Sequence, residues 1–177
     1  MQITGMLWGR KLLDLVEFPH SEVRGPELSV DEIKDMIKRH GQIFIKPLFK
    51  GGVGKKGKSG LLGRVDNIAD ALKEKERLYF AEHVDGFLKA KSDGVTYEGS
   101  VPADYEVYFS ISESTEHRCP IMTITHHGGV DIEELDDDKI KVVPFDALTG
   151  LKAFHVSNAL MELGAPTVLI SPLVQNL

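Results

Sequence analysis

The sequence is poor in cysteine and has no long apolar run. Its single cysteine, Cys119, cannot form a disulfide within the chain, and without a cysteine cluster there is no zinc motif. This cysteine usage fits a reducing compartment, so we expect a cytoplasmic protein. No stretch approaches the roughly 20 apolar residues that a membrane-spanning helix needs, and residues 1–18 are too interrupted by glycine and charge for a signal-peptide core. We expect no membrane partner and interpret this first segment as a short amphipathic helix.

The sequence also lacks an excess of positive charge. Its formal net charge is −6 and its pI is about 5.6, so the surface as a whole repels nucleic acids and anionic membranes. Any anion-binding site must therefore be local, and no nucleic-acid partner is expected. The 177 residues are 42% hydrophobic and 27% charged, which is typical of a folded chain with its own core. One domain or two small lobes are expected.

A helix and a strand are predicted early in the chain. Ser29 and Glu32 form a capping-box pair at the start of a run with helical spacing, which predicts a helix over residues 29–39. The next segment, residues 42–47, is short, apolar and rich in β-forming residues, and it carries Lys46 near its end. We predict a strand there.

A loop and three further elements come next. Residues 51–63 contain too many glycines for a stable helix, because each glycine costs up to about 1 kcal/mol there, and we predict a loop. The hydrophobic pattern then predicts a returning strand over 61–65, a helix over 67–76 and a strand over 78–82.

The remaining half mixes loop, strand and helix patterns. Residues 86–99 are polar and show no sustained period, which predicts an exposed loop. Apolar and polar residues alternate over 105–111, which predicts a half-buried strand that pairs with residues 121–125. A helical run over 151–163 is predicted to end at Gly164.

The glycine loop lies in a locally cationic stretch of this acidic chain. Glycines let backbone N–H groups approach an anion, and lysines supply mobile positive charges, so the combination suits a triphosphate. A solvated basic turn is the alternative explanation, but a strand that delivers a lysine directly before the loop favours an anion site. Between positions 46 and 64 the chain has no acid and has the basic residues Lys46, Lys50, Lys55, Lys56, Lys58 and Arg64.

Residues 52–59 also match the P-loop pattern G-x-x-x-x-G-K-S/T, a mononucleotide-binding signal. A P-loop must open directly into a helix whose N-terminus faces the phosphates. Here Gly60 and Gly63 follow, and helical periodicity resumes only near Asn67. We therefore disfavour the P-loop, and a P-loop NTPase remains a minor alternative.

Five segments, in this order along the chain, resemble the ATP-citrate lyase and succinyl-CoA synthetase families. They are a glycine–lysine nucleotide loop, a hinge beside adenine, a Glu-hydrophobic-Tyr strand, a Gly-Gly-Val-acid signature and a turn similar to Asp-Pro-Leu-Thr-Gly. The histidines in the fourth segment make it more similar to ATP-citrate lyase or citryl-CoA synthetase than to succinyl-CoA synthetase. The segments span residues 46–63, 81–84, 106–108, 126–133 and 146–151.

This resemblance implies an α+β fold of the ATP-grasp type, in which two lobes with mainly antiparallel sheets and packed helices hold ATP. By analogy, residues 25–84 are the small lobe. Residues 1–24 and 104–177 belong to the larger lobe, and residues 85–103 are a connecting loop.

The resemblance also implies the residues that bind the nucleotide. A lysine is suited to phosphate, backbone groups to adenine and a carboxylate to the ribose hydroxyls. The implied roles are therefore Lys46 on the phosphates, Lys56, Gly57 and Lys58 in the covering loop, Glu82, His83, Val84 and Asp85 along the adenine edge, and Glu106 on the ribose.

In these families, ATP phosphorylates a histidine on another domain or subunit, and the phosphoryl group passes to the acid before CoA attacks. The resemblance thus implies ATP and Mg²⁺ as cofactors and a CoA-binding, phosphohistidine-bearing subunit or domain as partner. The family's Mg²⁺ ligands follow a Leu-Glu-x-Asn-Pro strand, whereas residues 169–173 offer no acid. We expect the chain to stop before that strand and the metal ligands to lie outside it. No catalytic residue is assigned, and the isolated chain is expected to be nearly inert.

Two alternative interpretations remain, one for the histidine segment and one for the whole chain. His126 and His127, with Asp131 and Glu133, could be read as a metal site, but adjacent histidines point to opposite faces of a strand, which disfavours it. The whole chain could also be a noncatalytic assembly module that keeps the fold without using nucleotide. Titration with ATP and Mg²⁺ separates this module from the ATP-binding enzyme part.

Overall fold

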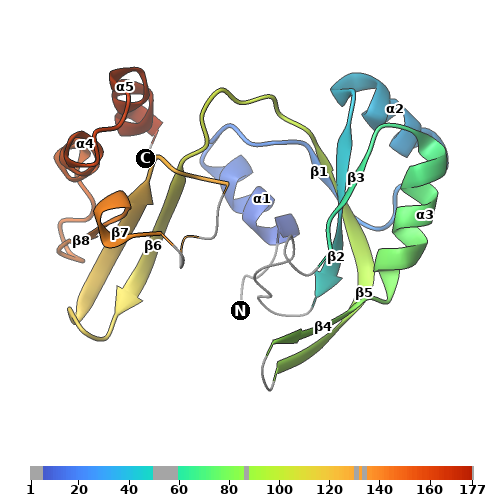
Figure 1. Ribbon diagram of the computed structural model, residues 1–177, viewed down its shortest axis with the longest axis horizontal. Helices are drawn as coiled ribbons and strands as arrows, with labels where there is room; N and C mark the ends of the chain where they lie inside the picture. The colour runs from blue at the N-terminus through green and yellow to red at the C-terminus, as the bar shows by residue number, and fades with distance from the viewer. Residues whose placement is uncertain (1–5, 50–59, 86–87, 130–131, 133–134, 177) are drawn as a thin grey trace. The chain divides into compact units, whose positions relative to one another are not determined.

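The computed structural model describes residues 6–49, 60–85, 88–129, 132 and 135–176 of the chain. It contains two compact units, Met1–Pro102 and Ala103–Leu177 (Figure 1). Each unit combines an antiparallel sheet with helices, so the mixed helix and sheet content expected from the sequence is confirmed.

The first unit is built around a five-stranded sheet. Its path has the order β1-β5-β2-β3, and β4 pairs with β5 beside that path. All these pairs are antiparallel. The elements are α1 (Met6–Leu15), β1 (Val23–Arg24), α2 (Val30–His40), β2 (Ile43–Phe49), β3 (Gly63–Val65), α3 (Ile68–Tyr79), β4 (Glu82–Asp85) and β5 (Leu88–Gly99).

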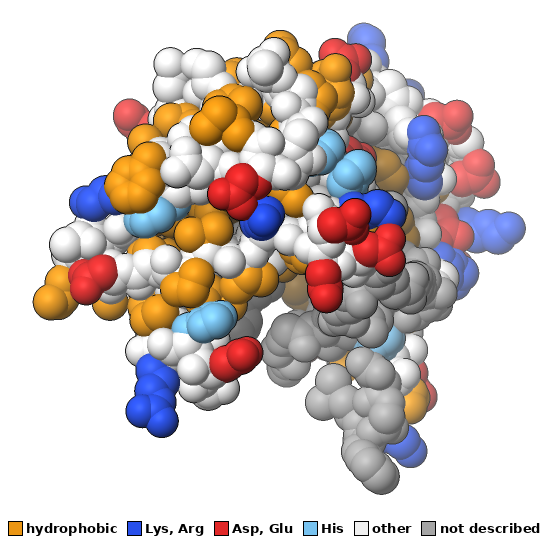
Figure 2. Space-filling view, turned by 60° about the vertical axis from the view of Figure 1, so that its left-hand side comes forward, with side chains coloured by type: hydrophobic (Ala, Val, Ile, Leu, Met, Phe, Trp, Pro, Cys, Tyr) orange, Lys and Arg blue, Asp and Glu red, His pale blue; other side chains and the backbone are white. Residues whose placement is uncertain are grey.

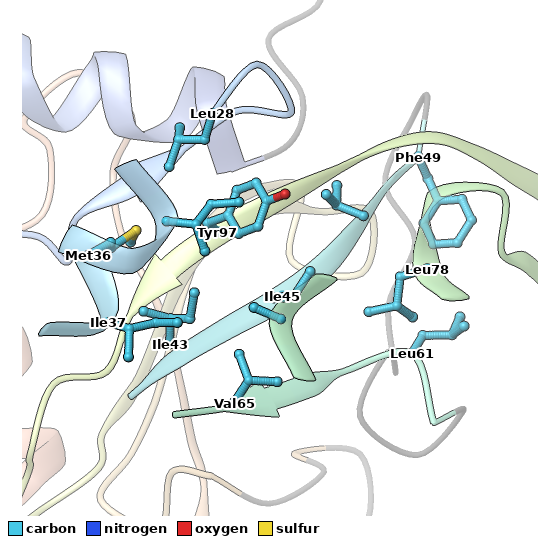
Figure 3. Packing of buried hydrophobic residues seen from close by; sticks show 13 residues of the cluster. Leu28, Met36, Ile37, Ile43, Ile45, Phe49, Leu61, Val65, Leu78 and Tyr97 are labelled. Atoms are coloured by element: carbon cyan, nitrogen blue, oxygen red, sulfur yellow. The ribbon is translucent and has the colours of Figure 1, made fainter. Parts of the chain in front are cut away.

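Helices α2 and α3 lie on one face of this sheet and bury the core of the unit (Figure 3). The predicted capping box is present at the start of α2, where Ser29 and Glu32 bond reciprocally, and Gly41 ends that helix with a φ of 68°. Asn67 caps α3 by accepting from the Asp70 N–H. The two sheet-facing helix surfaces and the strands contribute the buried residues Ile33, Met36, Ile37, Ile43, Ile45, Val65, Ala71, Leu78, Val95 and Tyr97.

The alternation of side chains along β2 decides which residues face away from the helices. Ile43, Ile45, Pro47 and Phe49 are buried, whereas Phe44, Lys46 and Leu48, which alternate with them, are only partly buried. Because successive side chains of a strand point to opposite faces, Lys46 lies on the face of the sheet opposite α2 and α3.

Two predicted elements of this unit are wrong. The segment predicted as an exposed loop, residues 86–99, contains the long strand β5, which pairs with β1, β2 and β4. The strand predicted over 78–82 starts later, because α3 continues to Tyr79 and buries Leu78 completely, so that β4 begins only at Glu82. In both places pairing and packing with distant segments override the local pattern.

The division of the chain also differs from the predicted lobes. Residues 1–24 fall in the first unit and do not belong with residues 104–177. In the first unit, Val23 and Arg24 pair with Glu98 and Tyr97 of β5. The expected connecting loop over 85–103 is largely this central strand. The boundary between the units follows Pro102.

The second unit has a three-stranded antiparallel sheet with the order β6-β7-β8. The predicted pairing of residues 121–125 with the preceding strand is confirmed, because Ile121 lies opposite Ser112 and Thr125 opposite Tyr108. The predicted helix is also present and ends before Gly164, whose φ is 66°. The elements are β6 (Tyr108–Ser114), β7 (Cys119–Thr125), the 3-10 helix η2 (Asp137–Lys139), β8 (Lys141–Pro144), α4 (Ala153–Glu162) and α5 (Thr167–Asn176).

The core of the second unit joins β7 to the two C-terminal helices. Met122 and Ile124 are buried against Val156, Ala159 and Leu160 of α4. Large hydrophobic side chains also reach the surface among charged ones, as Figure 2 shows, and in this unit they include Leu148, Phe154, Met161 and Val168. Within the described residues, no helix has the length and apolarity required to cross a membrane.

Candidate functional site

Lys46 forms an ion pair with Glu98 on the face of the first unit's sheet that lies opposite α2 and α3. Its ammonium contacts the Glu98 carboxylate, although the two residues are 52 positions apart in the chain. The pairing follows from the register of β2 and β5, in which Phe44 lies opposite Glu98 and Lys46 opposite Thr96. The two side chains are therefore diagonal neighbours on one face of the sheet, within reach of a long lysine.

Glu98 has a second partner outside the sheet. The Ser21 hydroxyl, just before β1, donates to Glu98 Oε1 at 2.9 Å, while the ammonium of Lys46 contacts Oε2. The Lys46 and Glu98 side chains are 25% and 18% exposed, so water still reaches the pair. The predicted phosphate lysine thus stands at a surface that a ligand can approach.

Residues 82–85, predicted to lie along adenine, form β4. Glu82, His83 and Val84 lie opposite Lys91, Ala90 and Lys89 of β5. His83 is buried, with its ring 6.2 Å from that of Phe49, whereas Glu82 and Val84 are exposed. Of the predicted set, His83 is a packed side chain, and the adenine role of this strand stays a prediction.

Glu106 and the Gly128–Gly129 pair, separate in sequence, meet in the second unit. The Gly128 N–H donates to the Glu106 carbonyl at 2.8 Å. A Cβ at Gly128 would lie 2.6 Å from the Glu106 carbonyl carbon, and one at Gly129 would collide with the Glu106 carboxylate. Gly129 also has a φ of 75°, a conformation that side chains disfavour. The two glycines therefore accommodate the exposed Glu106.

Glu106 lies just before its strand and not within it. The sequence predicted a strand over 105–111 that includes Glu106, but β6 begins at Tyr108. Glu106 is therefore in the segment that follows the boundary between the two units, and its backbone carbonyl is held by Gly128. This contact orients the residue without a strand ladder.

His126 and His127 lie past the end of β7, which stops at Thr125. Their ring centroids are 4.1 Å apart, so the predicted placement on opposite faces of a strand is wrong: the alternation ends with the strand. Burial lowers the pKa of His126, and the neighbouring His127 lowers it further. Among the described residues, no group of three or more His, Cys, Asp or Glu side chains is arranged to hold a metal ion.

Comparison with known proteins gives this geometry a context. No protein-family model matches the chain. The beta subunit of an ADP-forming succinate–CoA ligase from Desulfatibacillum aliphaticivorans is 28% identical over 156 residues, which are 85% of this chain and 40% of that subunit. This chain is a homologue of succinate–CoA ligase beta subunits. It spans about 40% of the length of that relative.

This chain is also similar in fold to solved structures of other CoA-dependent enzymes. ATP citrate lyase from Methanothrix soehngenii, in complex with citrate and coenzyme A, matches with a TM-score of 0.55 and 20% identity over 89% of this chain and 39% of that one. A dinucleotide-forming acetyl-CoA synthetase from Ca. Korarchaeum cryptofilum matches with a TM-score of 0.57 and 13% identity, over 88% of this chain and 63% of that one. The resemblance to succinyl-CoA synthetase is confirmed by these relatives, and the resemblance to ATP-citrate lyase is confirmed at the level of the fold.

The element that follows the P-loop pattern does not fit the P-loop alternative. Residues 52–59 lie outside the described part of the chain, as do the predicted loop residues Lys56, Gly57 and Lys58. The chain then makes a turn at Gly60 and enters β3, which pairs with β2. A P-loop requires a helix directly after its motif, and here a strand of the sheet comes first.

Two residues of the Lys46 ion-pair site, Glu98 and Ser21, were not predicted from the sequence. Glu98 belongs to the segment interpreted as a loop, so its place beside Lys46 was not foreseen. One signal was available: Val95 and Tyr97 alternate with polar residues, which is the pattern of a half-buried strand.

Proposed function

We propose that this chain is the ATP-binding part of an ATP-dependent acid–CoA ligase or lyase of the ATP-citrate lyase and succinyl-CoA synthetase group. The observation that carries the proposal is the position of Lys46 in this homologue of succinate–CoA ligase beta subunits. Its ammonium lies on the sheet face opposite α2 and α3, shortly before the glycine–lysine segment. A lysine in this position supplies a point charge for phosphate oxygens.

The roles of the other residues follow the same proposal. Lys56, Gly57 and Lys58 cover the phosphates, and residues 82–85 run along adenine. Glu106 accepts hydrogen bonds from the ribose hydroxyls, for which an exposed carboxylate held by its own backbone is suited. No residue of this chain is assigned a catalytic step.

The acid substrate and the phosphoryl acceptor belong to this proposal as well. Citrate is the proposed acid, supported by the histidines before Gly128 and by the fold shared with an ATP citrate lyase. A histidine on a CoA-binding partner subunit or domain is the proposed acceptor, and the related acetyl-CoA synthetase structure contains a phosphorylated phosphohistidine segment.

Magnesium is proposed as the second cofactor, with ligands outside this chain. The described residues contain no cluster of acids that fits the metal, and residues 169–173 lie in α5 and include no acid. When bound with ATP, the metal would neutralise phosphate charge. This chain's own contribution is to bind and orient the nucleotide.

Calorimetric titration with ATP tests the proposal. Lys46→Ala should weaken ATP binding roughly tenfold to 150-fold, because a hydrogen bond to a charged group is worth about 1.5–3 kcal/mol. Lys73→Ala, which removes an exposed lysine of α3, is the matched control and should bind like the parent chain. Equal affinity of the parent and the Lys46 variant would reject the assignment of Lys46, and absence of binding in both would favour the noncatalytic assembly module.

A further inference from the structure

Glu98 has both carboxylate oxygens engaged in the chain as it stands. Oε1 accepts from the Ser21 hydroxyl at 2.9 Å, and Oε2 contacts the ammonium of Lys46. The carboxylate is thus anchored by β5 on one side and by the segment before β1 on the other. An anchored acid beside a flexible lysine controls where the ammonium is held.

The position of the ammonium shows which way Lys46 is drawn. The Nζ atom lies 5.9 Å from the centroid of the Phe44 ring, two residues back along β2, and Phe44 is the residue opposite Glu98. The side chain therefore leans toward the start of β2 and away from Phe49, where the strand ends. Two attractions, the carboxylate and the ring face, favour this orientation.

The pair is nearly neutral, which has a consequence for a phosphate ligand. An ammonium in contact with a carboxylate presents little net charge to an approaching polyphosphate, and the carboxylate repels that polyphosphate. Because both side chains are still partly exposed, the contact is weak enough for a multiply charged ligand to break.

We propose that Glu98 is an internal counterion of Lys46, which it holds back until the phosphate groups of a nucleotide displace it. The inference rests on the proposed function, since it concerns the same lysine. Glu98 is then a positioning residue that opposes nonspecific capture of small anions. A ligand with several phosphate charges competes with the carboxylate better than a singly charged one does.

The test is the ATP affinity of Glu98→Gln in the 177-residue chain. This change keeps the size of the side chain and an acceptor for Ser21 but removes the negative charge. We expect ATP to bind about fivefold more tightly, the upper worth of a partly exposed ion pair. Glu76→Gln removes one charge from an exposed position on α3 of the same unit and should leave the affinity unchanged.

A double-mutant cycle separates this role from a structural one. In a Lys46→Ala background, Glu98→Gln should no longer tighten ATP binding, because the cation that it releases is absent. Adenosine, which lacks phosphate, should bind both parent and Glu98→Gln equally. Ser21→Ala, which frees one carboxylate oxygen, should shift ATP affinity in the same direction by less, and it serves as the second variant if Glu98→Gln unfolds.

Each result decides between two statements. If the parent chain binds ATP and Lys46→Ala weakens it, but Glu98→Gln binds no more tightly, the counterion role is overturned and the proposed function stands. If neither the parent nor Glu98→Gln binds ATP, both are overturned. If Glu98→Gln still tightens ATP binding in the Lys46→Ala background, the role of Glu98 as counterion of that lysine is also rejected.

Discussion

Tyr97 carries a buried hydroxyl that has no hydrogen-bond partner among the described residues. The side chain has no exposed surface and packs in the core of the first unit, near Met36 and Leu28 (Figure 3). Burial raises the pKa of the Tyr97 hydroxyl to about 12, because the charged form is poorly solvated there. An unpaired buried hydroxyl costs stability, so at the scale of one residue this core is not at its optimum.

Replacing Tyr97 by phenylalanine should therefore raise the free energy of unfolding by about 1 kcal/mol at neutral pH, measured by urea denaturation. The pKa of Tyr97 is about 12 when folded and near 10 when unfolded, so its ionisation leaves stability unchanged below pH 10 and lowers the free energy of unfolding as the pH rises toward 12. Tyr97→Phe should lack that alkaline loss. The exposed Tyr105→Phe is the control, and a destabilised Tyr97 variant would show that the hydroxyl has a partner.

At the scale of elements, Glu22 ties the last turn of α2 to β1. Its carboxylate accepts from Arg39 Nη2 at 2.9 Å and from Arg24 Nε at 3.0 Å, and His40 Nε2 lies 2.9 Å from Oε2. Burial opposes ionisation of Glu22, but the contacts with His40, Arg39 and Arg24 outweigh it and lower its pKa to about 2. The helix is thus fixed by its capping box at one end and by this ion cluster at the other.

Glu22→Gln should lower the free energy of unfolding by about 2 kcal/mol at pH 7, a value reduced for the partial exposure of the cluster. The folded pKa of about 2 lies below the unfolded value of 4.5, so the contribution is present above pH 4.5 and is lost as the pH falls toward 2. Denaturation curves of parent and variant should converge at that acid limit. A gap that stays constant from pH 7 to pH 2 would contradict the role of the charge, and Glu76→Gln serves as the charge control.

At the scale of the whole molecule, the chain consists of two units joined by an exposed segment. The boundary follows Pro102, and residues 101–106 are exposed and precede β6. Each unit has its own buried cluster of hydrophobic residues. A segment of this kind is where proteases reach a folded chain first.

Brief digestion with chymotrypsin should cut first after Tyr105, whose side chain is 50% exposed in this segment. Mass spectrometry should find residues 1–105 and 106–177 as the earliest products. Tyr105→Ser should slow the first cut, whereas Tyr79→Ser, at the end of α3, should not. Initial cleavage after Phe80 or Leu148 would contradict this prediction, because the segment that the protease reaches first would then lie inside a unit.

Local signals in the sequence were sufficient for several elements. The ends of α2 were predicted correctly from Ser29, Glu32 and Gly41, because caps and helical spacing act within one or two turns of chain. β2 and Lys46 were found because an apolar strand precedes a lysine-rich glycine run. β5 was missed because Lys89, Lys91 and Asp93 make its first half polar, and its pairing with β1, β2 and β4 is not encoded locally.

The sequence by itself thus determined the main helices, the strand that carries Lys46 and the relation to CoA ligases, all of which depend on neighbouring residues or ordered motifs. Only the tertiary structure decided that Glu98 contacts that lysine, that Ser21 bonds to Glu98, and that Glu106 contacts Gly128 and Gly129. These contacts depend on strand register and on turns that join residues far apart in the chain. Register is chosen by the packing of whole sheet faces, which no short window of sequence contains.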